Sequence, residues 1–377
     1  MSSKRQVAVV GVGQTDFGAL YAQKDARRNE TALGIEALKA ALDDAGLHKN
    51  EVDGLITSRI EYAASADAMG FKSLRYVNGL EGSGRMSGVS FQMATTLIET
   101  GQADVVACVY GNNGRSVQMK YGGYVGTPTM QYDGIYGMTS PGASLAHMYR
   151  RYQHLYNAPD NALANIAINN RNNALLNPVA VMREALTEDQ YMASRYIAEP
   201  LRLFDYCIIN DGGVAVILAS MDRAKDLAKR PVRVAAKAAA TTISNFYSDT
   251  NLFYDICQDV GGRVYGESGL QPKDMDCAQI YDNFTPTVLF SLEGFDYAPR
   301  GEAWRWASLD RIGLTGEMPI NTAGGHTAES YMQGWGHHVE AVRQIRGEAG
   351  ARQIPNCNIV QYMCASPIVS SHILIGE

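Results

Sequence analysis

An internal repeat constrains the fold of this chain more than any other feature of its sequence. Residues 46–53 (GLHKNEVD) and residues 269–276 (GLQPKDMD) both begin with Gly-Leu and end with an apolar residue followed by Asp, and each leads into a short apolar run. Short apolar runs of this kind predict buried strands, and a Gly after a helical pattern predicts the end of a helix. The repeat indicates that one unit of helix and strand occurs twice in the chain.

A second pair of segments repeats in the same order. One helical pattern leads to the strand predicted at residues 103–110 (ADVVACVY), and another leads to the strand predicted at residues 357–364 (CNIVQYMC). Helices that alternate with strands predict an α/β fold with a mainly parallel sheet. We therefore predict two duplicated βαβ-rich halves, residues 1–230 and residues 231–377.

Residues 111–200 depart from this alternation and are rich in Tyr, Asn, Gly and Met. We interpret them as a long insertion in the first half, with some helices of its own. Long insertions on α/β scaffolds often build a substrate pocket or a subunit interface. An elaborated surface explains the composition equally well.

Composition excludes several classes of protein. The 377 residues include 33 Lys and Arg against 39 Asp and Glu, a net charge of −6 without a dense basic run, which argues against nucleic-acid binding. No apolar stretch reaches the ~18–20 residues that span a bilayer, and the N-terminus has no apolar signal-peptide core. We expect a cytoplasmic protein that does not bind membranes.

The cysteines and histidines give little support for a metal site. None of the six cysteines forms a CxxC pair. His337 and His338 are adjacent in a predicted helix, where neighbouring side chains face apart. The sequence therefore predicts no metal site.

Three motifs resemble those of the thiolases in their order and spacing. Residues 77–84 (VNGLEGSG), followed by a predicted helix, resemble the nucleophile loop of that family. Residues 211–213 (DGG) resemble its Asp-Gly segment, and residues 321–325 (NTAGG) resemble its Asn-x-x-Gly-Gly motif. The chain is identified as a member of the thiolase superfamily, closest to its sterol-carrier-protein branch. The resemblance implies the thiolase fold, with two duplicated halves in a layered αβαβα arrangement, and a homodimer.

The residues that carry thiolase chemistry are replaced in this sequence. The position of the family's nucleophilic cysteine falls at Gly84, or at Glu81 if a three-residue gap is allowed. The position of the family's histidine, six residues after Gly325, holds Tyr331, and a third active-site position holds Tyr281. The ordinary Claisen mechanism is therefore not supported, because it requires an acyl-cysteine.

Two tyrosines at these positions resemble the lipid-transfer-protein-like aldolases of bacterial steroid side-chain degradation, which use the thiolase fold without the cysteine. The resemblance implies that Tyr281 and Tyr331 are catalytic. It implies retro-aldol cleavage of a β-hydroxyacyl-CoA derived from a steroid side chain, which yields a ketone and a short acyl-CoA such as propionyl-CoA. It also implies a complex with a small OB-fold zinc-ribbon domain protein. No cofactor is expected to be covalently bound, and CoA enters as part of the substrate thioester.

Retro-aldol cleavage needs a base for the substrate hydroxyl and donors for the thioester enolate. Tyrosine has an ordinary pKa of ~10, so a tyrosinate base needs help from neighbouring donors or charge. A hydrogen bond between Tyr281 and Tyr331 would let one hydroxyl relay a proton to the other. Loop residues expected to meet the enolate oxygen or CoA, in part through backbone N–H groups, are Ser83, Gly84, Gly324 and Gly325. Candidates for auxiliary roles are His326, Glu329, Asp282 and Glu81.

Two other functions remain open from the sequence. A thiolase-like acyltransferase would need a displaced nucleophile such as Cys364 or Ser83, and a non-catalytic subunit would bind CoA esters without turnover. Cys108 lies within a predicted strand and is expected to be a core residue. Tyr362, in the last predicted core strand, is expected to tolerate the loss of its hydroxyl.

Overall fold

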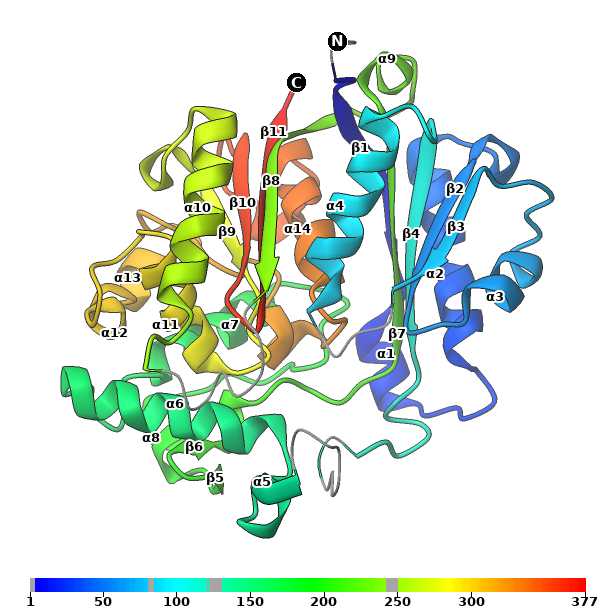
Figure 1. The fold of residues 1–377 in the computed structure, drawn as a ribbon. Coiled ribbons are helices and arrows are strands. Elements are labelled where there is room, and N and C mark those ends of the chain that lie inside the picture. The colour runs from blue at the N-terminus through cyan, green and yellow to red at the C-terminus, as the bar shows by residue number, and fades with distance from the viewer. Residues whose placement is uncertain (1–3, 81–84, 121, 123–130, 242–249) are drawn as a thin grey trace.

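The computed structural model describes residues 4–80, 85–120, 122, 131–241 and 250–377. Within them, nine strands form one sheet in the order β3-β2-β4-β7-β1-β8-β11-β10-β9 (Figure 1). The strands of this sheet are β1 (Val7–Gln14), β2 (Gly54–Ser58), β3 (Tyr76–Gly79), β4 (Val105–Asn112), β7 (Gly212–Ser220), β8 (Val232–Thr241), β9 (Cys277–Ile280), β10 (Ile359–Cys364) and β11 (Ile368–Gly376). Strands β5 (Tyr196–Ala198) and β6 (Leu201–Arg202) form a separate pair.

Helices cover the sheet and fill its connections. The longer helices are α2 (Glu30–Ala45), α4 (Met86–Glu99), α6 (Pro141–Tyr156), α7 (Ala164–Leu175), α10 (Tyr254–Ser268), α11 (Thr285–Gly294) and α14 (Trp335–Arg346). The shorter ones are α1 (Phe17–Ala22), α3 (Tyr62–Ala68), α5 (Gln131–Ile135), α8 (Glu188–Ala193), α9 (Met221–Ala224), α12 (Ala303–Trp306) and α13 (Leu309–Ile312). Single 3₁₀ turns are η1 (Lys49–Glu51), η2 (Leu203–Asp205), η3 (Pro272–Asp274) and η5 (Gly350–Arg352), and η4 (Gly325–Glu329) is a π-helical turn. None of the helices in the described residues is long and apolar enough to cross a membrane.

The repeat in the sequence corresponds to a repeat in the structure. Strands β1, β2, β4 and β7 with helices α2 and α4 follow the same order as strands β8, β9, β10 and β11 with helices α10 and α14. The two sets of strands meet where β1 pairs with β8. The predicted duplication is therefore confirmed, whereas the exact boundary near residue 230 stays a prediction.

The repeated Gly and Asp residues have the same structural roles in both halves. Gly46 and Gly269 end helices α2 and α10 in the left-handed conformation, with φ of 68° and 73°, which a residue with a side chain rarely adopts. The Asp53 carboxylate accepts the first backbone N–H groups of the β4 region, at 2.8–3.0 Å. The Asp276 carboxylate accepts the backbone N–H of Asn358 and of Ile359, at 2.7 and 2.8 Å. Each Asp thus fixes the start of the neighbouring strand.

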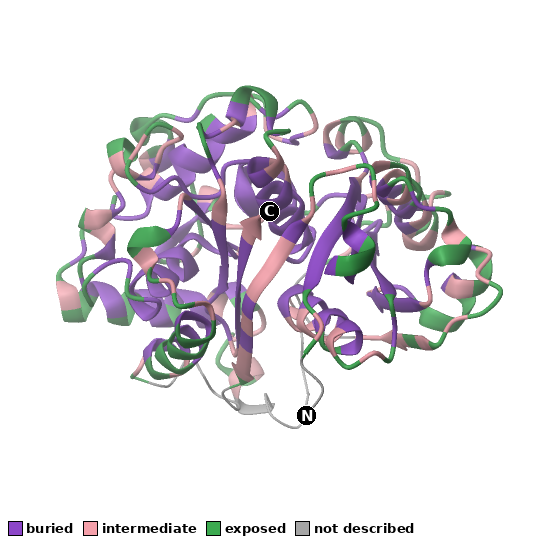
Figure 2. Ribbon diagram, turned by 90° about the horizontal axis from the view of Figure 1, so that it is seen from above, coloured by how far each residue is buried: buried purple, intermediate pink, exposed green. Residues whose placement is uncertain are grey.

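The elements form layers. Helices α4 and α14 lie between the two halves of the sheet and contact strands of both (Figure 1). Helix α2 packs on the other face of the first half, and α10 packs on the other face of the second half. Figure 2 shows the buried residues gathered on the strands and on the helices between them. This is the predicted αβαβα arrangement.

The prediction of a mainly parallel sheet is wrong. Only the pairs β2–β3, β2–β4 and β9–β10 are parallel, and the other pairs in the described sheet are antiparallel. The reason lies in the connections. The chain leaves β4 at Asn112 and returns to β7 at its register partner Gly212, so β7 must run back along β4. A tight turn joins β10 to β11 with the same result.

Candidate active site

Tyr281 and Tyr331 lie together in the interior of the second half. Their hydroxyl oxygens are 3.2 Å apart, and the two residues are 1% and 8% exposed. Tyr281 directly follows β9, where its backbone N–H extends the ladder to the carbonyl of Met363 at 2.8 Å. The backbone N–H of Tyr331 donates to the side-chain oxygen of Asn210 at 2.8 Å. The structure therefore brings the two predicted residues into contact, whereas their catalytic role stays a prediction.

The Gly-Gly pair is required by the packing of the loop that leads to Tyr331. Gly324 and Gly325 have φ of 109° and 58°, and a Cβ on Gly325 would lie 2.4 Å from the Asp282 carboxylate. The backbone N–H of Gly324 donates to the carbonyl of Asn321 at 2.8 Å. That N–H is therefore used within the turn, and the expected role of Gly324 and Gly325 toward the enolate or CoA stays a prediction. The pair serves to bring the loop close to Asp282 and α7.

Asp282 is the buried acceptor around which this loop is organised. Its carboxylate accepts the backbone N–H of His326 at 2.9 Å and lies 3.1 Å from Nε2 of His337. It also accepts a hydrogen bond from the amide of Asn170 at 2.7 Å. A fully buried carboxylate with several donors is well compensated as an anion. Asp282 is next to Tyr281 in the chain, so it ties this tyrosine to the loop of Tyr331.

His326 packs between the two tyrosines. Its ring meets those of Tyr281 and Tyr331 edge-on, with centroids 4.8 and 5.0 Å away. Its Nε2 accepts the backbone N–H of Gly334 at 2.9 Å, which assigns the ring proton to Nδ1. Nδ1 lies 3.3 Å from the Asp282 carboxylate, close but not aligned as a hydrogen bond. Burial, followed by the neighbouring His337, holds the pKa of His326 well below its usual value, so the ring is neutral. The ring thus packs beside the pair, and the auxiliary role expected of His326 stays a prediction.

Asp282, His326 and His337 also form the one group in the described residues whose ligand atoms lie close enough for a metal ion, all within 4.8 Å of one another. The two histidine rings are stacked, with centroids 4.4 Å apart and planes 21° apart. A metal ion lies in the plane of each imidazole that binds it, and two stacked rings do not share such a point. The sequence prediction overlooked this group because its members come from separate segments. The geometry fits a hydrogen-bonded cluster.

Among the remaining predicted residues that the structure describes, Glu329 is bonded away from the tyrosine hydroxyls. The Glu329 carboxylate accepts a hydrogen bond from the amide of Asn177 at 2.9 Å, and burial, followed by Glu340, raises the pKa of Glu329 to about 7. Glu81, Ser83 and Gly84 lie outside the described residues. The outcome of their predicted roles therefore stays open.

Four asparagines of α7 and the segment after it hold the tyrosine loop in place, and the sequence analysis missed them. Their amides donate at 2.7–3.2 Å to carbonyls or side chains between residues 282 and 329. The sequence did contain a signal for them. Asparagine is a poor helix former, so a cluster of asparagines in a helix indicates that their side chains have another role, such as hydrogen bonding. The residues are Asn169, Asn170, Asn173 and Asn177.

We expect Asn170→Ala to lower the free energy of unfolding by about 1–3 kcal/mol, because it leaves buried groups without their donor. Asn170 donates to Asp282 at 2.7 Å and to Thr327 at 2.8 Å. The matched control is Asn172→Ala in the same helix, since Asn172 is exposed. Urea unfolding of both variants measures the difference. Equal stability of the two variants would show that the hydrogen bonds of Asn170 do not stabilise the tyrosine loop.

Tyr362, which is expected to tolerate the loss of its hydroxyl, belongs to the same cluster as the two tyrosines. Tyr281, Tyr331, Tyr362 and Cys364 pack together as one buried group. The hydroxyl of Tyr362 lies 3.2 Å from Oγ of Ser87, near the start of α4. Tyr362→Phe is therefore not a neutral control for the pair. The sequence could not show this, since Ser87 is far from Tyr362 in the chain.

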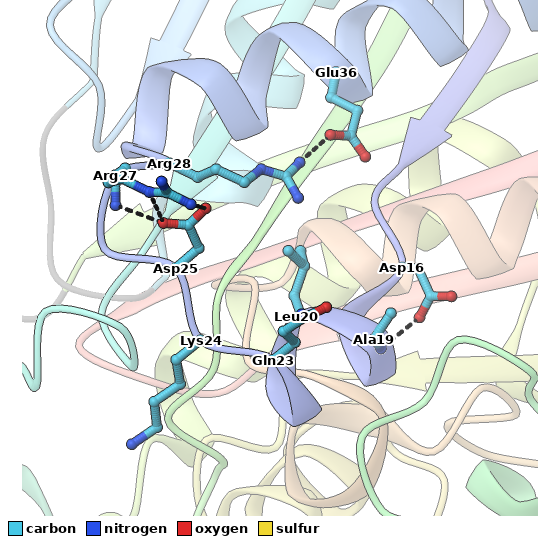
Figure 3. A pocket seen from close by; sticks show the side chains of 9 residues that line it. All are labelled: Asp16, Ala19, Leu20, Gln23, Lys24, Asp25, Arg27, Arg28 and Glu36. Carbon is cyan, nitrogen blue, oxygen red and sulfur yellow. Dashed lines mark hydrogen bonds and ion pairs between the residues drawn. The ribbon is translucent and has the colours of Figure 1, made fainter.

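A surface pocket of about 360 Å³ lies elsewhere, beside α1 (Figure 3). Two of its basic side chains are paired, since Arg27 pairs with Asp25 and Arg28 pairs with Glu36. Neither tyrosine lines it. The pocket therefore has no observed link to the cluster described above.

Comparisons with known proteins agree with this fold. A family model described as thiolase C-terminal domain-like matches residues 238–375. The 17-hydroxy-3-oxo-4-pregnene-20-carboxyl-CoA lyase of Mycobacterium tuberculosis is 35% identical over 390 residues, which cover 98% of this chain and 99% of that protein. The steroid side-chain-cleaving aldolase of Thermomonospora curvata is 33% identical and covers 98% of this chain and 97% of its own. The solved structure of the Ltp2-ChsH2(DUF35) aldolase has a TM-score of 0.90 at 31% identity and covers 98% of each chain. The predicted resemblance is confirmed in both sequence and fold.

Proposed function

Because the chain belongs to the thiolase superfamily, in its branch of steroid side-chain-cleaving aldolases, we propose that it cleaves a β-hydroxyacyl-CoA by a retro-aldol reaction. The observation that carries the proposal is the buried contact between the hydroxyls of Tyr281 and Tyr331, 3.2 Å apart. The substrate is a CoA thioester derived from a steroid side chain. Two relatives at 35% and 33% identity are named for such a cleavage.

The proposed reaction needs only proton transfers and charge stabilisation. A tyrosine oxygen takes the proton of the substrate β-hydroxyl, and the bond between the α- and β-carbons breaks. The former hydroxyl carbon becomes the ketone, and the electron pair moves into the thioester enolate. A proton returned through the pair to the α-carbon yields the short acyl-CoA, such as propionyl-CoA. No group is transferred to the protein.

The burial of the pair sets the protonation state from which this reaction starts. Burial, followed by the nearby Tyr331, raises the pKa of Tyr281 well above its usual value. Tyr281 is therefore protonated in the free protein. A tyrosinate base forms only when the bound substrate or a nearby cation favours the anion.

The direct test of the proposed function is product analysis. The full chain is incubated with a panel of β-hydroxyacyl-CoA and β-ketoacyl-CoA thioesters, and products are identified by mass spectrometry. We expect a ketone and a shorter acyl-CoA from a β-hydroxyacyl-CoA with a tertiary hydroxyl. Cleavage only of β-ketoacyl-CoA, with consumption of free CoA, would support an acyltransferase instead.

We further propose that the protein works in the cytoplasm as a homodimer in complex with a small OB-fold zinc-ribbon domain protein. The name of the related Ltp2-ChsH2(DUF35) aldolase, whose fold this chain shares at a TM-score of 0.90, supports a partner chain. Strand β3, which is half-buried and lies at the edge of the sheet, offers a place where a second subunit could add a strand. Light scattering with and without the partner tests the assembly, and a stable monomer in both cases would contradict the dimer.

Thiol chemistry is expected to be dispensable. Cys364 is fully buried, and burial raises its pKa to about 11, while Cys108 is buried within β4. A thiol that stays protonated is a weak nucleophile. We expect Cys364→Ser and Cys108→Ser to keep turnover within a few-fold of the parent in the product assay. An acyl adduct trapped on Cys364 would favour the acyltransferase.

A further inference from the structure

Arg85 borders the tyrosine cluster, and no side chain in the described part of the chain forms an ion pair with it. It immediately precedes α4, its Nε is buried, and that atom has no hydrogen-bond partner. No ion pair of the described residues includes it. Arg352 pairs with Glu340 at 2.9 Å, and Arg171, whose Nε is also buried without a partner, donates through another nitrogen to the carbonyl of Glu184 at 2.9 Å. A buried N–H group without an acceptor is unfavourable, so the Nε of Arg85 favours a ligand that supplies one.

The start of α4 reaches the tyrosines through Gly334. A Cβ built on Gly334 would lie 2.3 Å from Oγ of Ser87, 2.8 Å from the hydroxyl of Tyr362 and 3.3 Å from the ring of Tyr281. These three groups therefore surround one point. Ser87 is two residues after Arg85, so the guanidinium is attached at the edge of the cluster. The N-terminal end of a helix of this length adds a partial positive charge there.

The histidine ring that packs between the two tyrosines supplies no positive charge to them. His326 is neutral, as shown above. Burial raises the pKa of Tyr362 well above its usual value and that of Cys364 to about 11, and Arg85 is among the groups that oppose the latter rise. This influence on Cys364 agrees with a guanidinium that faces the cluster. Retro-aldol cleavage places a negative charge on the thioester oxygen, which a fixed cation stabilises strongly in a buried site.

Resting on the retro-aldol function proposed above, we propose that Arg85 binds the thioester carbonyl oxygen of the substrate and stabilises the enolate that forms on it. The electron pair of the broken carbon–carbon bond moves to this oxygen, and the proton of the substrate hydroxyl goes to the tyrosine pair. Arg85 keeps its own protons throughout. Its N–H groups are the donors, and its charge favours the anionic state of the tyrosine base.

Binding of two CoA derivatives tests this role without turnover. Carboxymethyl-CoA carries an anionic group that mimics the enolate, and S-ethyl-CoA is its neutral counterpart. We expect Arg85→Met to weaken the binding of carboxymethyl-CoA by about 10–100-fold, the range for a hydrogen bond to a charged group, and to change that of S-ethyl-CoA by less than about threefold. Arg85→Lys should keep part of the preference. The matched control is Arg150→Met, because Arg150 is half-exposed and pairs with the exposed Glu199. Circular dichroism and thermal unfolding verify that each variant is folded.

Turnover separates a failure of this role from a failure of the proposed function. We expect Arg85→Met to lower kcat by about 10²–10³-fold, as the loss of one oxyanion donor does. A parent that cleaves substrate while Arg85→Met has near-normal kcat and an unchanged preference for carboxymethyl-CoA overturns the role of Arg85 alone. Equal weakening of both derivatives also overturns it, because Arg85 would then recognise another part of CoA. A parent that neither binds these derivatives nor cleaves the panel overturns the proposed function and this role together.

Discussion

Tyr281→Phe and Tyr331→Phe are each expected to lower kcat by about 10²–10⁴-fold, the usual contribution of general acid–base catalysis. Each change removes one hydroxyl from a pair whose oxygens are 3.2 Å apart and leaves the buried ring in place. KM should change little, because the hydroxyls act mainly in the transition state. Steady-state kinetics on a substrate that the parent cleaves measures both values.

The double variant distinguishes a shared relay from two independent groups. It should lose less than the product of the two single losses, because residues that act as one unit are not additive. The matched control is Tyr149→Phe, since Tyr149 is buried and its hydroxyl has no hydrogen-bond partner among the residues that the structure describes. That control should keep normal turnover. The catalytic assignment is wrong if both single variants keep near-normal rates.

Asp282→Asn is expected to have the second largest effect, on both stability and activity. One carboxylate oxygen becomes an NH₂ group that faces the donors of His326, His337 and Asn170. Each donor left unpaired costs about 1–3 kcal/mol of the free energy of unfolding. Turnover should also fall in the fraction that remains folded, because Asp282 joins the segment of Tyr281 to the loop of Tyr331.

Urea unfolding and kcat at a temperature where the variant is folded measure these two effects separately. The control is Asp310→Asn, since Asp310 is exposed and such substitutions usually stay within about 0.5 kcal/mol. If Asp282→Asn and this control had the same free energy of unfolding, the prediction that the Asp282 carboxylate stabilises the fold through its hydrogen bonds would be wrong.

Local patterns in the sequence predicted the parts of this fold that local rules determine. Gly46 and Gly269 end helices because only a residue without a side chain adopts their φ readily, and the Asp that follows each binds the start of a neighbouring strand. The direction of β7 depends instead on the end of β4 at which the long segment between β4 and β7 returns to the sheet. The sequence of that segment does not show which way the chain returns to the sheet, so the sheet was wrongly expected to be mainly parallel.

The candidate site shows the same division. The two tyrosines were found because each occupies an active-site position of a motif that resembles one in the thiolases. Such a position can be located by counting residues from the motif. Asn170 and His337 reach Asp282 from segments 112 and 55 residues away, and no short pattern links them. Arg85 is distinguished by its surroundings in the folded chain, where its buried Nε has no hydrogen-bond partner among the described residues. No pattern in the sequence indicates this.

The central claim is that this chain performs a retro-aldol cleavage through the tyrosine pair. Turnover of a tertiary β-hydroxyacyl-CoA in deuterium oxide without added CoA tests it most directly, with mass spectrometry of the acyl-CoA product. The account predicts a ketone and an acyl-CoA that carries one solvent deuterium at its α-carbon, with both products lost in the Tyr281→Phe and Tyr331→Phe variants. Cleavage that requires free CoA, or that persists at the parent rate in both variants, would contradict it.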